Sequence, residues 1–149
     1  MTDYPRLHAQ LEALTGRFPY RIANLANASA LLYQTLEGLN WAGFYLMEDG
    51  KLVLGPFQGR TACIEIAVGR GVCGPAVAQD RTLRVEDVHR FPGHIACDCA
   101  SNSEIVVPIR KDGQIIGVLD LDSPRTGRFT EEDQTGLEEF VRILERTTF

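Results

Sequence analysis

Apolar residues recur at intervals of three and four near both ends of the chain, which is the spacing of amphipathic α-helices. The predicted helices take their apolar stripes from three sets of residues: Leu7, Leu11 and Leu14; Ile22, Leu25, Ala28, Leu32 and Leu36; and Leu137, Phe140, Val141 and Leu144. Gly38 and Asn40 are expected to end the second helix. Thr130 is expected to cap the last helix, whose first turn carries the acids 131–133.

The middle of the chain has the texture of β-strands. The runs 41–47 and 52–54 flank the turn residues 48–50 and predict a hairpin. The runs 105–109 and 114–122 flank a second turn, so they are expected to pair antiparallel. Shorter strands are predicted at 63–68 and 83–85, with a short helix at 75–79 between them and a long loop over 87–103.

This order of elements predicts one α+β domain over residues 1–149. We expect a central, largely antiparallel sheet with helices packed on one face. Long connections are then expected to cover the other face, and a ligand pocket would lie there. No internal repeat or low-complexity tract interrupts this organisation.

Composition and charge narrow the function classes. The chain has 149 residues, of which 44% are hydrophobic and 23% charged, and its net charge is −5. An acidic chain without a Lys/Arg run argues against nucleic acid as a partner. The longest apolar runs are too short to span a bilayer, and the first residues do not resemble an export signal. We therefore expect a soluble cytoplasmic protein with no membrane partner.

A glycine-rich segment, Gly69–Gly74, matches the spacing G-x-G-x-x-G of dinucleotide-binding loops. We reject that interpretation because the helix after it is too short for a crossover and the neighbouring strands form hairpins. The segment is instead expected to be a tight turn that exposes Cys73 near a helix start. Helix N-termini lower the pKa of a thiol, which would make Cys73 reactive.

The four cysteines, Cys63, Cys73, Cys97 and Cys99, all lie in the central part of the chain. In a reducing cytosol such a cluster indicates reactive or metal-binding thiols rather than a disulfide framework. A zinc site of His94 with Cys63, Cys97 and Cys99 is one alternative, although C-x-C is an unusual zinc spacing. Cys63 could also be core. A thiol redox cycle fits better, in which one cysteine becomes a sulfenic acid and a second resolves it as a disulfide.

Acidic and aromatic side chains gather on the predicted strands. Asp120 and Asp122 are two residues apart, so both point to one face, and Glu104 begins the strand expected to pair with theirs. Three converging acids would raise at least one pKa, which would leave a proton donor beside an ammonium-binding carboxylate. The alternative is that they are solvated turn residues. Trp41 and Tyr45 share a strand face, either as core or as pocket wall.

The chain resembles the free methionine-(R)-sulfoxide reductases, which are built on a GAF domain. The resemblance runs from about Leu39 to Leu144, and the joint spacing of Cys63, Cys73 and Cys97 makes it specific. The matching segments are Asn40–Tyr45, Gly55–Gly59, Ala62–Cys63, Gly69–Gly74, Val85–Val88, Gly93–Asp98, Ser101–Val106 and Ile116–Asp122.

The resemblance implies reduction of free methionine-(R)-sulfoxide, with thioredoxin as the reductant. We expect no cofactor and no metal. By this likeness Cys97 is the attacking thiolate, Cys63 its resolving partner and Cys73 a third cysteine that joins the exchange. Cys99 falls outside the family's cysteines and is expected to be a bystander. The positions that enclose the substrate are Trp41, Tyr45, Glu104, Asp120 and Asp122, with proton donation assigned to either Glu104 or Asp122.

Three functions from different classes follow from these observations. The first is the reductase. The second is a GAF-type module that binds a small ligand or senses redox state without turnover, and the third is a zinc-stabilised interaction domain. A second copy of the chain, forming a homodimer, is a further candidate partner.

Overall fold

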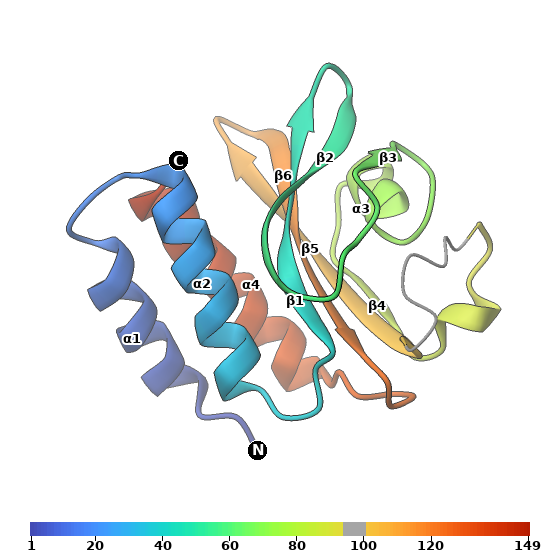
Figure 1. Cartoon of the computed structure of the whole chain (residues 1–149), viewed down its shortest axis with the longest axis horizontal. Coiled ribbons are helices and arrows are strands. Elements are labelled where there is room, and N and C mark those ends of the chain that lie inside the picture. The colour runs from blue at the N-terminus through green and yellow to red at the C-terminus, as the bar shows by residue number, and fades with distance from the viewer. Residues whose placement is uncertain (94–100) are drawn as a thin grey trace.

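The computed structural model describes residues 1–93 and 101–149, and within them six strands form one antiparallel sheet (Figure 1). The strand order is β3-β2-β1-β6-β5-β4. The strands are β1 (Trp41–Glu48), β2 (Lys51–Gly59), β3 (Glu65–Ala67), β4 (Leu83–Val85), β5 (Ser103–Lys111) and β6 (Gln114–Ser123). Both predicted hairpins, β1–β2 and β5–β6, are confirmed, and β1 and β6 join them at the centre of the sheet.

Three helices, α1 (Tyr4–Thr15), α2 (Arg21–Thr35) and α4 (Glu131–Thr147), lie on one face of the sheet (Figure 1). The other face carries α3 (Cys73–Gln79), the short 3-10 helix η1 (Val88–Arg90) and the connection from β2 to β3. The predicted α+β architecture, with helices on one face and connections over the other, is therefore confirmed. No helix among the described residues has both the length and the apolar character needed to cross a membrane.

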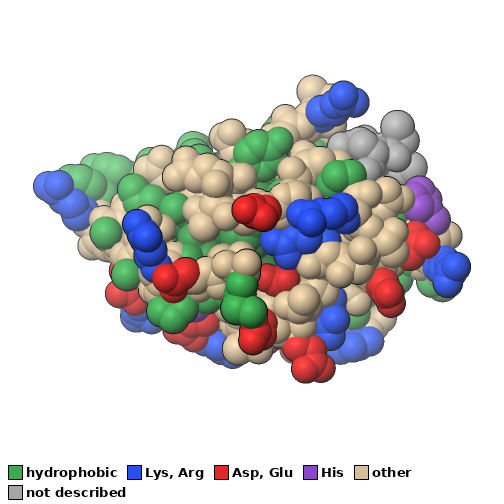
Figure 2. Space-filling view, turned by 90° about the horizontal axis from the view of Figure 1, so that it is seen from below, with side chains coloured by type: hydrophobic (Ala, Val, Ile, Leu, Met, Phe, Trp, Pro, Cys, Tyr) green, Lys and Arg blue, Asp and Glu red, His purple; other side chains and the backbone are tan. Residues whose placement is uncertain are grey.

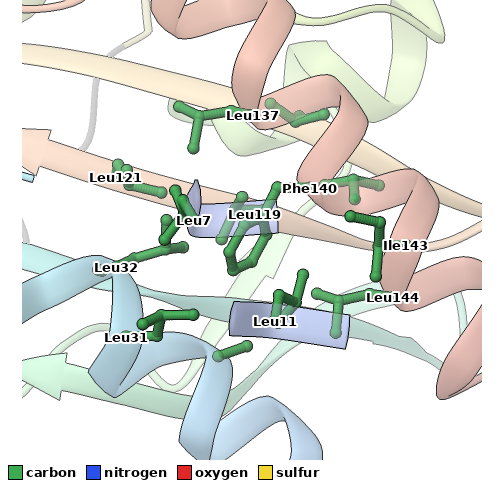
Figure 3. Packing of buried hydrophobic residues seen from close by; sticks show 14 of the residues in the cluster. Leu7, Leu11, Leu31, Leu32, Leu119, Leu121, Leu137, Phe140, Ile143 and Leu144 are labelled. Carbon is green, nitrogen blue, oxygen red and sulfur yellow. The ribbon is translucent and has the colours of Figure 1, made fainter. Parts of the chain in front are cut away.

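The two faces of the sheet bury two separate apolar clusters. Leu119 and Leu121 of β6 point toward the three long helices, where they meet Leu7, Leu32 and Phe140 (Figure 3). The alternate residues of the strands point the other way and form a second cluster with α3 and η1. Because successive strand residues face opposite sides, each central strand contributes to both clusters.

Two predicted helix stripes include a residue that is exposed. Leu14 is 45% exposed, because the inward line of α1 runs through Leu7 and Leu11 to Thr15 at intervals of four. Ile22 is 77% exposed, since it lies in the first turn of α2, ahead of the residues that reach the sheet. On the surface seen in Figure 2, acidic and basic side chains lie interspersed.

Several predicted bounds also change. The helix α2 ends at Thr35, before the expected Gly38, and β2 runs on to Gly59 rather than stopping at residue 54. The expected strand 63–68 is reduced to Glu65–Ala67, so Cys63 lies in the connection that precedes β3. The helix α3 begins at Cys73, two residues earlier than expected.

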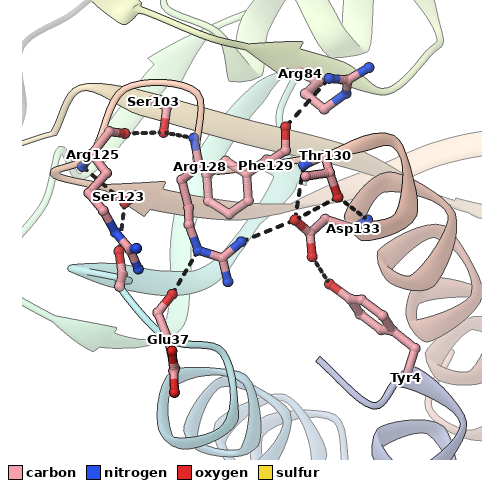
Figure 4. A network of polar contacts seen from close by, with 11 residues as sticks. Tyr4, Glu37, Arg84, Ser103, Ser123, Arg125, Arg128, Phe129, Thr130 and Asp133 are labelled. Carbon is pink, nitrogen blue, oxygen red and sulfur yellow. Dashed lines mark hydrogen bonds and ion pairs between the residues drawn. The ribbon is translucent and has the colours of Figure 1, made fainter. Parts of the chain in front are cut away.

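A largely buried ion pair anchors the start of α4, where Thr130 forms the predicted cap (Figure 4). The carboxylate of Asp133 accepts hydrogen bonds from the Thr130 backbone N–H at 2.9 Å and from the Tyr4 hydroxyl at 2.7 Å, and it pairs with the Arg128 guanidinium at 3.0 Å. Burial alone would raise the pKa of Asp133, but these hydrogen bonds and the positive charge outweigh it and lower that pKa.

Replacing Asp133 with asparagine is expected to reduce the free energy of unfolding at neutral pH by about 3 kcal/mol, because the largely buried Arg128 side chain would lose its counter-charge. A lowered pKa stabilises the fold above the ordinary Asp range and loses that effect as the pH falls through the folded-state value. The difference between the two proteins should therefore shrink on acidification. Urea unfolding across an acid series measures it, with Asp49→Asn, at an exposed turn, as the control. A pH-independent difference would contradict this account.

Candidate active site

The three acids predicted to converge form part of one row across the sheet. Trp41 of β1 pairs with Asp122 of β6, which pairs with Glu104 of β5. Asp120 lies two residue pairs further along β6, opposite Gly43 of β1. Directly paired residues share a face, so these side chains all lie on the side away from the three long helices. The prediction that Asp120 and Asp122 share a face and that Glu104 lies on the paired strand is confirmed.

The three acids differ in how deeply they are buried. Glu104 is 7% exposed and Asp120 is 5% exposed, whereas Asp122 is half-buried. Burial raises the pKa of Glu104 well above its usual range, and the neighbouring charges of Asp120 and Asp122 raise it further. Burial also raises the pKa of Asp120, but hydrogen bonding with Glu104 and Cys73 partly offsets that effect. Within this pair the neighbouring acids raise the pKa of Glu104 further, whereas hydrogen bonds oppose the rise in the pKa of Asp120, which favours Glu104 as the proton donor.

Asp120 also has unused capacity to bind a ligand. Among the described residues, none donates a hydrogen bond to its buried Oδ1 atom. A buried acceptor without a donor is costly, so a ligand that brings an N–H or a positive charge would be stabilised there. The row thus combines a carboxyl that can give up a proton with an acceptor that can bind an ammonium group.

The structure corrects the expectation for Cys73. It is a free thiol, 2% exposed, and its sulfur lies with Glu104 and Asp120 oxygens in a group whose members are all within 4.8 Å of one another. Burial raises its pKa, and the charges of Asp120 and Glu104 raise it further, so these effects outweigh the start of α3. The next residue, Gly74, packs closely on the backbone at 67–69, and the glycine loop leaves Cys73 buried instead of presenting it to solvent.

Aromatic side chains lie beside the acids on the same face. The Trp41 ring stacks on Tyr45 at 5.9 Å and on Phe57 at 5.2 Å between ring centroids. At Gly43, which lies between Trp41 and Tyr45 in β1, an added Cβ would collide with Phe57 and Trp41. Glycine therefore allows the Phe57 and Trp41 side chains to pack against the strand at this point. Burial, followed by the nearby acids, raises the pKa of Tyr45, which keeps its hydroxyl neutral.

The stacked rings of Trp41, Tyr45 and Phe57 form what we call the aromatic wall. Phe57, and Gly43 beside it, were not predicted from the sequence to belong to the site. The available signal was an aromatic residue flanked by glycines in the segment Gly55–Gly59, next to the strand that carries Trp41. Only the pairing of Gly43 with Phe57 places the two side by side, and that register depends on an irregularity in the β1–β2 ladder.

Of the remaining cysteines, Cys63 lies among the described residues, whereas Cys97 and Cys99 do not. Cys63 is half-buried and disulfide-bonded. Cys73, the other described cysteine, is a free thiol and is not its partner. Three of the predicted residues lie outside the described part of the chain. They are Cys97, the predicted attacking thiol, and Cys99 and His94, which were predicted to bind zinc in the alternative interpretation.

Comparison with known proteins agrees with this fold. The family model of the GAF domain matches residues 20–147. In sequence, the chain is 60% identical to protein YtsP of Bacillus subtilis over 97% of its length and 90% of the relative's. It is 59% identical to the free methionine-R-sulfoxide reductase of Escherichia coli, over 96% of this chain and 87% of that protein.

Solved structures give the same result. The fRMsr of Staphylococcus aureus, solved in complex with substrate, superposes with a TM-score of 0.96 at 52% identity and covers 100% of this chain and 97% of that one. The free methionine-R-sulfoxide reductase of Neisseria meningitidis, also in complex with its substrate, gives 0.94 at 45% identity over 97% and 87% of the two chains. The fold and the family-model match define a GAF-domain protein. The chain belongs to the free methionine-R-sulfoxide reductases, a family of enzymes within that class.

Proposed function

We propose that this chain reduces free methionine-(R)-sulfoxide to methionine with its own thiols. The observation that carries the proposal is the row of acids beside the aromatic wall, in which Glu104 is buried with a raised pKa and a buried oxygen of Asp120 has no donor among the described residues. A free amino acid brings both an ammonium group and a carboxylate to its site, unlike the same residue within a protein chain. The relatives named for this activity support the proposal.

The proposed substrate lies with its thioether end against Trp41 and Tyr45, whose stacked rings provide an apolar surface. Its ammonium group binds the carboxylates of Asp120 and Asp122. We assign proton donation to Glu104 rather than Asp122, because Glu104 is the more deeply buried and its pKa is raised.

In the proposed reaction the Cys97 thiolate attacks the sulfoxide sulfur while Glu104 protonates the sulfoxide oxygen. The sulfur–oxygen bond of the substrate breaks, and the hydroxyl transfers to Cys97, which becomes a sulfenic acid as methionine leaves. The Cys63 thiol then attacks the sulfenic sulfur, forming a disulfide and releasing water. A thioredoxin dithiol reduces that disulfide by exchange. For Cys73 to take part in the exchange, it would first have to leave the apolar core in which it is buried.

A coupled assay tests this function. With thioredoxin, thioredoxin reductase and NADPH present, free methionine-(R)-sulfoxide should cause NADPH consumption. The S epimer and a peptide-bound sulfoxide should cause little, because a buried site with one attack geometry selects one epimer and one size. Equal rates with both epimers would reject the proposed substrate specificity. Tight binding of the R epimer without methionine release would reject the reductase activity in favour of a ligand-binding module.

A further inference from the structure

The connection between β2 and β3 crosses the site face of the sheet and carries Cys63. In Figure 1 this green segment leaves the end of β2 and passes in front of β1 before it reaches β3. It departs at Gly59, whose φ of 131° lies in the left-handed region that favours glycine. An added Cβ at Gly59 would meet the Trp41 ring, so the connection begins in close contact with the aromatic wall.

Two side chains of the wall donate hydrogen bonds to the backbone of this connection. The Trp41 indole N–H donates to the Arg60 carbonyl at 3.1 Å, and the Tyr45 hydroxyl donates to the Cys63 carbonyl at 2.9 Å. The Ile64 carbonyl accepts from the Leu54 backbone N–H, where the chain rejoins the sheet. Between Gly59 and Ile64, therefore, the polar groups of Trp41 and Tyr45 bind the backbone of the connection, while the faces of the same two rings line the site.

We propose that Tyr45 and Trp41 are positioning residues for Cys63, which hold its sulfur at the place where it resolves the oxidised cysteine. The Tyr45 bond is made at the carbonyl of Cys63 itself, so it fixes the backbone from which the sulfur projects. Disulfide geometry is narrow: the two sulfurs must meet at bonding distance with a restricted dihedral angle. A carbonyl that has lost its donor is free to shift, and the fraction of time that Cys63 spends in reach falls.

The inference rests on the proposed function for its place in the reaction. In the resolving step the Cys63 sulfur bonds to the sulfenic sulfur, the sulfur–oxygen bond breaks, and the oxygen leaves as water. In the proposed role, Tyr45 and Trp41 act on this step through their hydrogen bonds to the backbone of the connection. Trp41 and Tyr45 would also contact the substrate. The same two side chains would therefore serve both to bind the substrate and to place Cys63.

The test is Tyr45→Phe, which keeps the ring and removes the hydroxyl. Reduced protein is mixed with methionine-(R)-sulfoxide in the absence of thioredoxin and quenched over time. Methionine released and the disulfide at Cys63 are then quantified by mass spectrometry after thiol alkylation. We expect disulfide formation to slow about fivefold to tenfold more than methionine release, with the sulfenic acid accumulating as a dimedone adduct. An unchanged ratio of the two rates would overturn the proposal.

Tyr4→Phe is the matched control, because Tyr4 is also a buried tyrosine whose hydroxyl donates a hydrogen bond, to Asp133, away from the site. It should leave the ratio of rates as in the wild type. A second variant, Trp41→Phe, removes the indole N–H and should change the ratio in the same direction as Tyr45→Phe.

A measurement without substrate separates this inference from the proposed function. Each protein is equilibrated in buffers of reduced and oxidised dithiothreitol, and the fraction of Cys63 in the disulfide is determined. Tyr45→Phe should shift the midpoint about threefold or more toward the reduced form, and Tyr4→Phe should not shift it. If the wild type released no methionine, the proposed function would be rejected, but the redox equilibrium would still test the role of Tyr45. Identical midpoints for the wild type and Tyr45→Phe would reject that role.

Discussion

Cys97→Ser is expected to abolish turnover of free methionine-(R)-sulfoxide, with a loss of at least about a thousandfold in kcat. A serine hydroxyl is not ionised near neutral pH, and it forms no sulfenic acid, so both the attack and the later disulfide are lost. Substrate binding should persist because the acids and the aromatic wall are unchanged. The chain has a single tryptophan, Trp41, so intrinsic fluorescence reports binding at this wall directly.

Cys99→Ser makes the same chemical change two residues away and is the matched control. It should retain most of the wild-type rate, because Cys99 lies outside the cysteine set of the family that the chain resembles. The two variants are compared in the thioredoxin-coupled assay and by quantifying methionine after a single turnover. Full activity in Cys97→Ser, or loss only in Cys99→Ser, would transfer the attacking role to another thiol.

Glu104→Gln is expected to lower turnover roughly a hundredfold, the usual contribution of a general acid. Glutamine keeps the size of the side chain and can still donate a hydrogen bond to Asp120, but it cannot transfer a proton to the sulfoxide oxygen. In the wild type the activity should fall as the pH rises through the raised pKa of Glu104, since the donor is then ionised. That alkaline limb should be absent from the residual activity of the variant.

The same substitution should increase stability. A carboxyl whose pKa is higher in the folded than in the unfolded state favours folding fully below its unfolded value, about 4.3, and that contribution is lost as the pH rises. The free energy of unfolding of Glu104→Gln should therefore exceed that of the wild type, by an amount that grows from acid to neutral pH. Urea unfolding across that range measures the difference.

Glu86→Gln provides a matched control for both measurements, because Glu86 is exposed on the loop after β4. It should change neither the alkaline limb of activity nor the pH dependence of unfolding. If Glu104→Gln remained fully active, or unfolded with the same pH dependence as the wild type, Glu104 would not be the buried acid that supplies the proton.

Features that depend on local sequence were predictable. The shared face of Asp120 and Asp122 follows from the two-residue period of a strand, and the cap at Thr130 follows from its position ahead of an acidic first turn. The convergence of Glu104 with them needed only the short turn that joins β5 to β6. Each of these relations spans few residues or one hairpin, so a pattern in the sequence is sufficient.

Features that depend on packing between distant segments were not predictable. Cys73 follows a glycine loop that locally favours exposure, yet α3 docks on the sheet and buries its thiol among carboxyls more than thirty residues away. The contact of Phe57 with Trp41 required the register of β1 on β2. The bond from Tyr45 to the Cys63 carbonyl required the path of an irregular connection, which no periodicity encodes.

The alternation along β6 has a consequence for how this chain can vary. Leu119 and Leu121 point toward the helices, while Asp120 and Asp122 point to the opposite side and belong to the row of acids. Inserting or deleting one residue in β6 would exchange the two sets, bringing carboxylates into an apolar core and leucines into the site. Such a chain would fail to fold before its activity could be assayed. Selection for a folded protein therefore also preserves the orientation of the acids, and drift in this strand should be confined to substitutions.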